Sequence, residues 1–264
     1  MGGRGSKSSI ASGSATGGSL LNAQNQQNNP QNIANQAPTA ANTPVNPAGV
    51  NALTKMSDDQ LEALIKQSKT VDMPNHLADV HSATQNFVYA AGLNGKPEVL
   101  DDAAFNKYLS DNNIPKSQIL SRTVGGADYV VNGTNIKITP DQVTSMIKDS
   151  ELNYVGGKRG GSLHGAGTYF DMNGGSSTGY GSGSRKATCI GVLSKNAKVV
   201  DDSSLRGLVS SWQRSHPKAA KQIGSYSTSN MSIYALCMGY NVIKSGSYHN
   251  VIDRTALVMR QRNL

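Results

Sequence analysis

Hydrophobic residues recur at helical spacing in the segment that follows residue 50. Leu61, Leu64 and Ile65 form an apolar stripe behind Ser57, which can pair with Gln60 in an N-terminal capping box. The same spacing predicts helices over residues 78–91 and 101–109. Together these elements predict a helical annex over residues 51–113, with ordered structure beginning near Ser57.

The pattern changes to alternation and short apolar runs after residue 113. Residues 117–124 alternate like a strand, and residues 128–138 predict a hairpin that turns at Asn132-Gly133. Thr139 and Pro140 are typical of the start of a short helix. Further strands are predicted at 187–193, 197–200, 240–243 and 250–259, and further helices at 203–213 and 229–238. Helices that precede a run of short strands favour an α+β fold over residues 114–264.

Residues 1–50 lack the composition of a folded segment. They contain no Asp, no Glu and no aromatic residue, and consist mainly of Gly, Ser, Ala, Asn, Gln and Pro. Such a segment cannot bury enough apolar surface to offset the entropy lost on ordering. We therefore predict a disordered leader at 1–50, which could tether the chain to a phage or host protein.

Charge and cysteine content narrow the functional classes only partly. A net charge of +8 favours a polyanionic ligand such as a nucleotide, a nucleic acid or an acidic partner, although the Lys and Arg residues are scattered. Cys189 and Cys237 stand in apolar stretches and favour buried free thiols, with a disulfide between them left open. The five His residues share no ligand spacing, so no metal site is predicted. No apolar run approaches the roughly 18 residues of a membrane span, which favours a soluble protein of the host-cell cytoplasm or of a virion.

Three segments of the second half carry candidate chemistry. Arg122 is a charge inside an otherwise apolar strand, and such a charge must face solvent, a partner or a ligand. Residues 163–171 place glycines before Tyr169, where backbone can approach a ligand closely and an aromatic ring can stack on it. The third segment, residues 233–257, predicts a helix, a Gly stop and two strands. Packing alone explains most of its residues.

The order of these segments resembles the ADP-ribosyltransferase superfamily, above all domains of bacterial and phage proteins, including phage head-associated ones. An Arg-containing unit on the first strand, a GxGxYF unit, a Tyr-Gly pair and a terminal Gly-Tyr…Arg…Leu pattern follow one another over about residues 80–260. They are matched here by Ser121-Arg122-Thr123, by Gly165-Ala166-Gly167-Thr168-Tyr169-Phe170, by Tyr180-Gly181, and by Gly239-Tyr240 with Asp253-Arg254-Thr255-Ala256-Leu257.

The resemblance implies a split β-sheet core that holds NAD as substrate in a cleft. Arg122 is then expected to bind the NAD phosphates or a ribose, as a guanidinium suits oxyanions, and Tyr169 to stack on nicotinamide. The expected reaction moves ADP-ribose to a macromolecular acceptor, a protein in preference to a nucleic acid, and releases nicotinamide. The expected NAD-binding residues are Arg122, Thr123, Gly165, Gly167, Thr168, Tyr169, Phe170, Tyr180 and Ser227.

The sequence departs from the family at the catalytic acid. The Glu expected before the last strand is missing, and His249 or Asn250 takes its place, so the expected catalytic set is Arg122, His249 and Asn250. Glu151 and Asp253 are the nearest alternative acids. Residues 227–229 read Ser-Thr-Ser, which predicts first a helix cap and second an NAD contact through Ser227. The alternatives to a transferase are a catalytically silent NAD-fold binding or phage structural module, and an NAD glycohydrolase.

Overall fold

The computed structural model describes residues 49–71, 82–125, 127–131, 134–149, 165–172 and 186–263. The predictions for residues 1–48 of the leader, for Tyr180 and for Glu151 lie outside these ranges.

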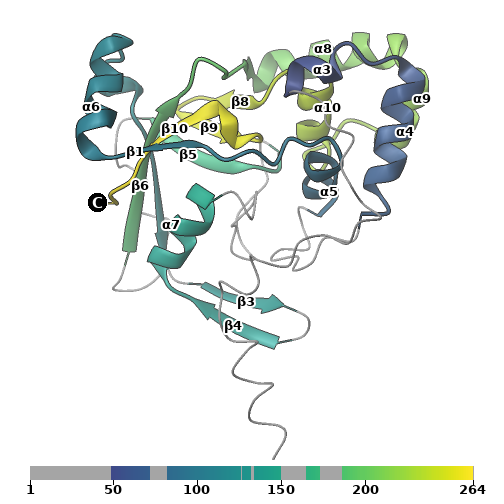
Figure 1. Cartoon of the computed structure of the whole chain (residues 1–264). Helices are drawn as coiled ribbons and strands as arrows, with labels where there is room; N and C mark the ends of the chain where they lie inside the picture. Colours follow the sequence, from purple (N-terminus) through teal and green to yellow (C-terminus); the bar gives the residue numbers. More distant parts are fainter. Residues whose placement is uncertain are drawn as a thin grey trace, which may run out of the picture.

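The centre of the described fold is one mixed sheet of eight strands (Figure 1). The outermost pairs at its two edges are parallel, and the pairs between them are antiparallel. The predicted combination of helices and strands is therefore confirmed. In spatial order the strands are β1 (Glu98–Leu100), β10 (Leu257–Arg260), β6 (Lys186–Leu193), β2 (Leu120–Gly125), β5 (Thr168–Met172), β9 (Tyr248–Val251), β8 (Val242–Ser245) and β7 (Val199–Asp201).

The sheet consists of two four-stranded halves with a short join between them. Strand β2 pairs with β6 along its whole length, from Leu120 to Gly125. On its other side β2 pairs with β5 only through Leu120↔Met172 and Ser121↔Asp171. No further residue pair follows between them, so β2 and β5 separate from Arg122 onward. In the described part of the chain, two residue pairs therefore join the halves of the sheet.

Eight α-helices and a separate hairpin complete the described part of the chain (Figure 1). The hairpin, β3 (Ala127–Val131) and β4 (Thr134–Ile138), is confirmed as the sequence predicts. Ser57 and Gln60 form the predicted capping box of the second helix. The helices are α3 (Val50–Leu53), α4 (Asp58–Ser68), α5 (Ser82–Ala90), α6 (Asp102–Asp111), α7 (Pro140–Asp149), α8 (Asp202–Ser215), α9 (Pro217–Ile223) and α10 (Met231–Cys237).

The two faces of the sheet pack against different helices. On one face, which we call the α7 face, Ile147 packs in a cluster with Leu120, Phe170 and Val251. On the opposite face, which we call the α6 face, Phe105 covers Ile190 and neighbouring residues of β6 and β10. The far end of the α6 face, at β7 and β8, belongs to a larger helical cluster. Helix α6 therefore covers one end of the α6 face, and the larger helical cluster covers the other end, with β2, β5 and β9 between them.

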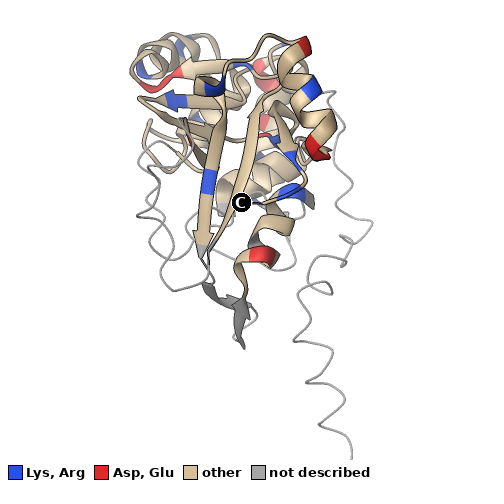
Figure 2. Cartoon of the chain, turned by 90° about the vertical axis from the view of Figure 1, so that its left-hand side faces the viewer, with Lys and Arg blue, Asp and Glu red and all other residues tan. Residues whose placement is uncertain are grey.

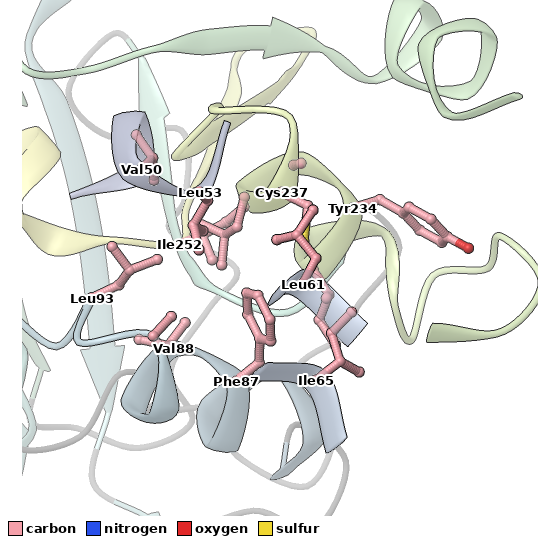
Figure 3. Close-up of a cluster of buried hydrophobic side chains, with 14 of the residues drawn as sticks. Val50, Leu53, Leu61, Ile65, Phe87, Val88, Leu93, Tyr234, Cys237 and Ile252 are labelled. Carbon is pink, nitrogen blue, oxygen red and sulfur yellow. The ribbon is translucent and has the colours of Figure 1, made fainter. Parts of the chain in front are cut away.

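The larger cluster joins the predicted annex to the C-terminal half of the chain. Leu61 and Phe87 from α4 and α5 lie with Cys237 of α10 and with Ile252 in one set of buried side chains (Figure 3). Strand β1, also within residues 51–113, pairs with β10. The helices of residues 51–113 therefore share a core with the C-terminal half.

Several elements differ from the sequence expectations. Order begins before Ser57, since Val50 of the predicted leader starts α3 and is 5% exposed. Residues 116–118 form a 3-10 turn in place of the start of a strand. Helix α10 begins at Met231, two residues after the predicted start. Strands β1 and β5 and helix α9 were not predicted, because they are short and their partners are distant in sequence.

Candidate functional site

A polar stripe crosses the middle of the α6 face, between helix α6 and the larger helical cluster. Strand register places six side chains there, because directly paired residues share a face and alternate residues on a strand do too. Among them, Ser121, Asp171 and Asn250 are buried, whereas the others are half-buried. The stripe consists of Ser121 and Thr123 on β2, Tyr169 and Asp171 on β5, and Tyr248 and Asn250 on β9.

Arg122 links the two halves of the sheet where β2 and β5 separate. Its Nη1 donates a hydrogen bond of 2.8 Å to the backbone oxygen of Tyr169. The Tyr169 hydroxyl in turn donates to the backbone oxygen of Gly165, which fixes the orientation of the ring along the start of β5. Two residues that sequence reasoning assigned to one ligand are thus in direct contact.

The glycines before β5 allow close packing against α10 and β9. Gly165 has φ +84°, and a Cβ added there would lie 2.4 Å from the Ser232 hydroxyl. A Cβ on Gly167 would lie 1.9 Å from Oδ1 of Asn250. Between them, the Ala166 carbonyl accepts hydrogen bonds of 2.7 Å from Ser232 and 3.4 Å from Asn250. The protein's own atoms therefore account for both glycines.

The candidate catalytic residues lie on both faces of the sheet. Asn250 pairs with Tyr169 and belongs to the stripe, whereas His249 pairs with Phe170 and belongs to the α7 face with Arg122. His249 is 4% exposed, and this burial holds its pKa below the usual value, opposed by its contact with the Ser247 carbonyl. A neutral imidazole is the favoured state there near neutral pH.

The other sequence candidates have structural partners. Phe170 is 1% exposed and packs in the α7-face cluster, which explains it without a ligand. Thr123 shares a 2.9 Å hydrogen bond with Thr188 on β6. Thr168 is buried on the α7 face opposite Val251.

The Ser227–Ser229 segment is not the side-chain cap that the sequence predicts. Asn230 occupies the N-cap of α10 without a capping side-chain bond, and its Oδ1 accepts instead from the Ser227 amide at 2.9 Å. The hydroxyls of Ser227 and Ser229 bond to each other at 2.7 Å. Both hydroxyls are exposed, and they precede the helix that packs on Gly165.

Asp171 is an acidic residue of the stripe that sequence reasoning missed. The acids expected from the sequence are Glu151 and Asp253, whereas Asp171 immediately follows the Tyr169-Phe170 unit. The proposed alternative Asp253 is buried, and its Oδ1 accepts from the amide and hydroxyl of Thr255. Burial raises the pKa of Asp253. Only the pairing of β5 with β2 and β9 reveals where Asp171 lies.

An open cavity of about 550 Å³ lies at the other end of the sheet. It is formed where the parallel strands β7 and β8 end and α8 begins. Its charges are mixed, and Figure 2 likewise shows Lys and Arg at separate positions on several elements. The cavity is lined by Asp201, Asp202, Ser203, Arg206, Lys244, Ser245 and Gly246.

Cysteine, metal and membrane chemistry can be assessed only for the described residues. Cys189 and Cys237 are both free and buried there, as predicted. Within those ranges no group of three or more His, Cys, Asp or Glu could hold a metal ion. No described helix has both the length and the apolar character that a membrane crossing requires. Comparison of the chain with family models, curated proteins and solved structures found no match.

Proposed function

We propose that the chain binds NAD across the polar stripe and transfers ADP-ribose from it to a macromolecular acceptor. The observation that carries this proposal is the join between the two half-sheets, where the Arg122 guanidinium touches β5 beside Tyr169. By register Arg122 belongs to the α7 face and Tyr169 to the α6 face, and the two meet at the break between β2 and β5, where the guanidinium reaches the Tyr169 carbonyl. A charged Arg and a half-buried Tyr at one break in a sheet suit a ligand with both phosphate and aromatic groups. The resemblance in sequence supplies the identity of that ligand.

The stripe also fits the general features of a nucleotide site. It lies between α6 and the larger helical cluster, and the Tyr169 side chain within it is half-buried. Tyr169 is held by its hydroxyl, so its ring is preorganised for stacking. Arg122 remains charged at any physiological pH, which suits the binding of phosphate.

The Arg122→Ala variant tests the proposal by NAD titration. Loss of a charged donor to a phosphate or ribose should raise the Kd for NAD by about 10- to 150-fold, the equivalent of about 1.5–3 kcal/mol. The Kd of Arg122→Lys should lie between those of the wild type and Arg122→Ala, because Lys keeps the charge and loses the planar fork of the guanidinium. Arg260→Ala is the matched control, since Arg260 at the end of β10 pairs with Asp102 of α6, away from the break between β2 and β5.

Two results would refute the role of Arg122. One is an unchanged Kd in Arg122→Ala with an intact melting transition, and the other is an equal loss of affinity in Arg260→Ala. With labelled NAD and cell extract, label transferred to protein or nucleic acid identifies a transferase. Release of nicotinamide without transfer identifies a glycohydrolase, and binding without either identifies a silent module.

A further inference from the structure

One rung of the polar stripe combines a buried carboxylate with a buried hydroxyl. Ser121 pairs with Asp171 in one of the two residue pairs that join the half-sheets, and Asp171 pairs with Tyr248 on its other side. Ser121 is 1% exposed and Asp171 is 3% exposed. Asp171 lies two residues along β5 from Tyr169, a separation of about 7 Å.

The Ser121 hydroxyl requires an explanation. It is buried, and within the described part of the chain it has no hydrogen-bond partner. Buried hydroxyls are nearly always hydrogen-bonded, and a buried hydroxyl without a partner destabilises the fold. Such a group in a native protein therefore points to a functional role. A sugar hydroxyl that accepts from Ser121 would satisfy this group, and it would lie beside the neighbouring Asp171 carboxylate.

We infer that Ser121 and Asp171 form the subsite for the nicotinamide-bearing ribose, with Asp171 as the catalytic carboxylate of the reaction. This inference rests on the proposed function. With nicotinamide stacked on Tyr169, the attached ribose extends along β5 by about the distance that separates Tyr169 from Asp171. The carboxylate thus takes the part for which the sequence offers no Glu near His249.

The chemistry assigned to Asp171 is electrostatic and consumes no group. The bond between the ribose C1′ and the nicotinamide nitrogen breaks, and its electron pair leaves with nicotinamide, which departs neutral. The positive charge moves to C1′ and its ring oxygen, where the Asp171 carboxylate stabilises it. A nucleophile of the acceptor, or water in its place, forms the new bond to C1′ and releases one proton to solvent.

Other described acids are less suited to this task. Asp253 precedes the 3-10 turn Arg254–Ala256, and Asp102 begins helix α6, so neither lies on the strands of the stripe. Asp201 is exposed at the end of β7 and, by register, lies on the α7 face with Lys244. Asp171 alone among these four belongs to the same stripe as Tyr169 and Asn250.

The main test compares Asp171→Asn with the wild-type chain in NAD binding and nicotinamide release. Asn keeps the shape and removes the charge, so the rate of release should fall by about 100- to 1,000-fold. The Kd for NAD should stay within about threefold. Asp201→Asn is the matched control, an Asp on the same sheet that should leave both quantities unchanged.

Ser121→Ala provides a second variant that should fold in any case. Because the lost hydroxyl has no partner in the described protein, its removal should not lower the melting temperature. The Kd for NAD should nevertheless rise by about twofold to twelvefold, the effect of one hydrogen bond to the ligand.

Each outcome decides between the inference and the proposed function. Wild-type protein that does not bind NAD overturns the proposed function and the subsite with it. NAD binding without nicotinamide release overturns the catalytic role of Asp171. Normal release by Asp171→Asn overturns that role while the proposed function stands. An unchanged Kd in Ser121→Ala overturns the ribose subsite, even if Asp171→Asn fails to fold.

Discussion

Glycine substitutions can separate backbone strain from steric overlap at the start of β5. Gly165 carries both features, with φ +84° and a neighbour at 2.4 Å. Gly167 carries only the overlap, with Asn250 at 1.9 Å, and Gly246 only the strain, with φ +59° and nothing within 4 Å. Gly207 in α8 carries neither. Replacing each of the four by Ala therefore isolates the two costs.

The magnitudes follow from the two features taken separately. A left-handed backbone costs a residue with a Cβ about 1–2 kcal/mol, which is the expected loss for Gly246→Ala. Overpacking a tight contact costs about 1–3 kcal/mol, which is the expected loss for Gly167→Ala. Gly165→Ala should lose about 2–5 kcal/mol, since both costs apply. Gly207→Ala should gain about 0.5–1 kcal/mol, because it removes a helical glycine.

Urea unfolding followed by circular dichroism measures these differences in the free energy of unfolding, provided that its dependence on urea concentration is the same in all variants. The order of stability should be Gly207→Ala, wild type, Gly246→Ala and Gly165→Ala, with Gly167→Ala below the wild type. If Gly165→Ala and Gly246→Ala lose equal stability, the close contact between β5 and α10 is not a determinant of the fold. A fall in stability for Gly207→Ala would contradict the expectation that a Cβ at this position of α8 meets no neighbouring atom.

Two further predictions concern buried titratable groups. Because burial holds the pKa of His249 below its unfolded value of 6.5, folding stability should be fully present above about pH 6.5 and decline as pH falls below it. His249→Gln should flatten that part of a urea-based stability profile; Lys244, Asp171 and Asp201, which also act on this ring, stay in place. Burial raises the pKa of Cys189 to about 11 and that of Cys237 further, so neither thiol should react with a disulfide reagent at pH 8 until the protein unfolds. Rapid reaction of one thiol in folded protein would contradict that burial.

Local signals of the fold were readable from sequence because their partners are close in the chain. Ser57 and Gln60 form the capping bonds that their spacing predicts, and Thr139, expected at the start of a helix, accepts from the Gln142 amide. Asp101 accepts from the amide of Ala104 at the start of α6. Each of these bonds spans three residues, so the sequence itself brings the two groups together.

Elements that depend on distant partners were not readable in the same way. Strand β1 exists because Glu98 to Leu100 pair with β10, more than 150 residues later. Val50 is ordered because the helical cluster of the C-terminal half covers it. Strand β5 follows glycines, which weaken a strand prediction, and is stabilised by Arg122 and by β9. Tertiary contacts decide all three.

Placement of the candidate site required the register of the strands. A shift by one residue would exchange the two faces of a strand, so sequence order alone could not separate His249 from Asn250. The observed pairing puts Asn250 beside Tyr169 and puts His249 beside Phe170. The same register brings Asp171, which follows the recognisable motif by one residue, next to Ser121. Asp171 of β5 is therefore close to the position of His249 and Asn250 on β9, because β5 and β9 are neighbours in the sheet.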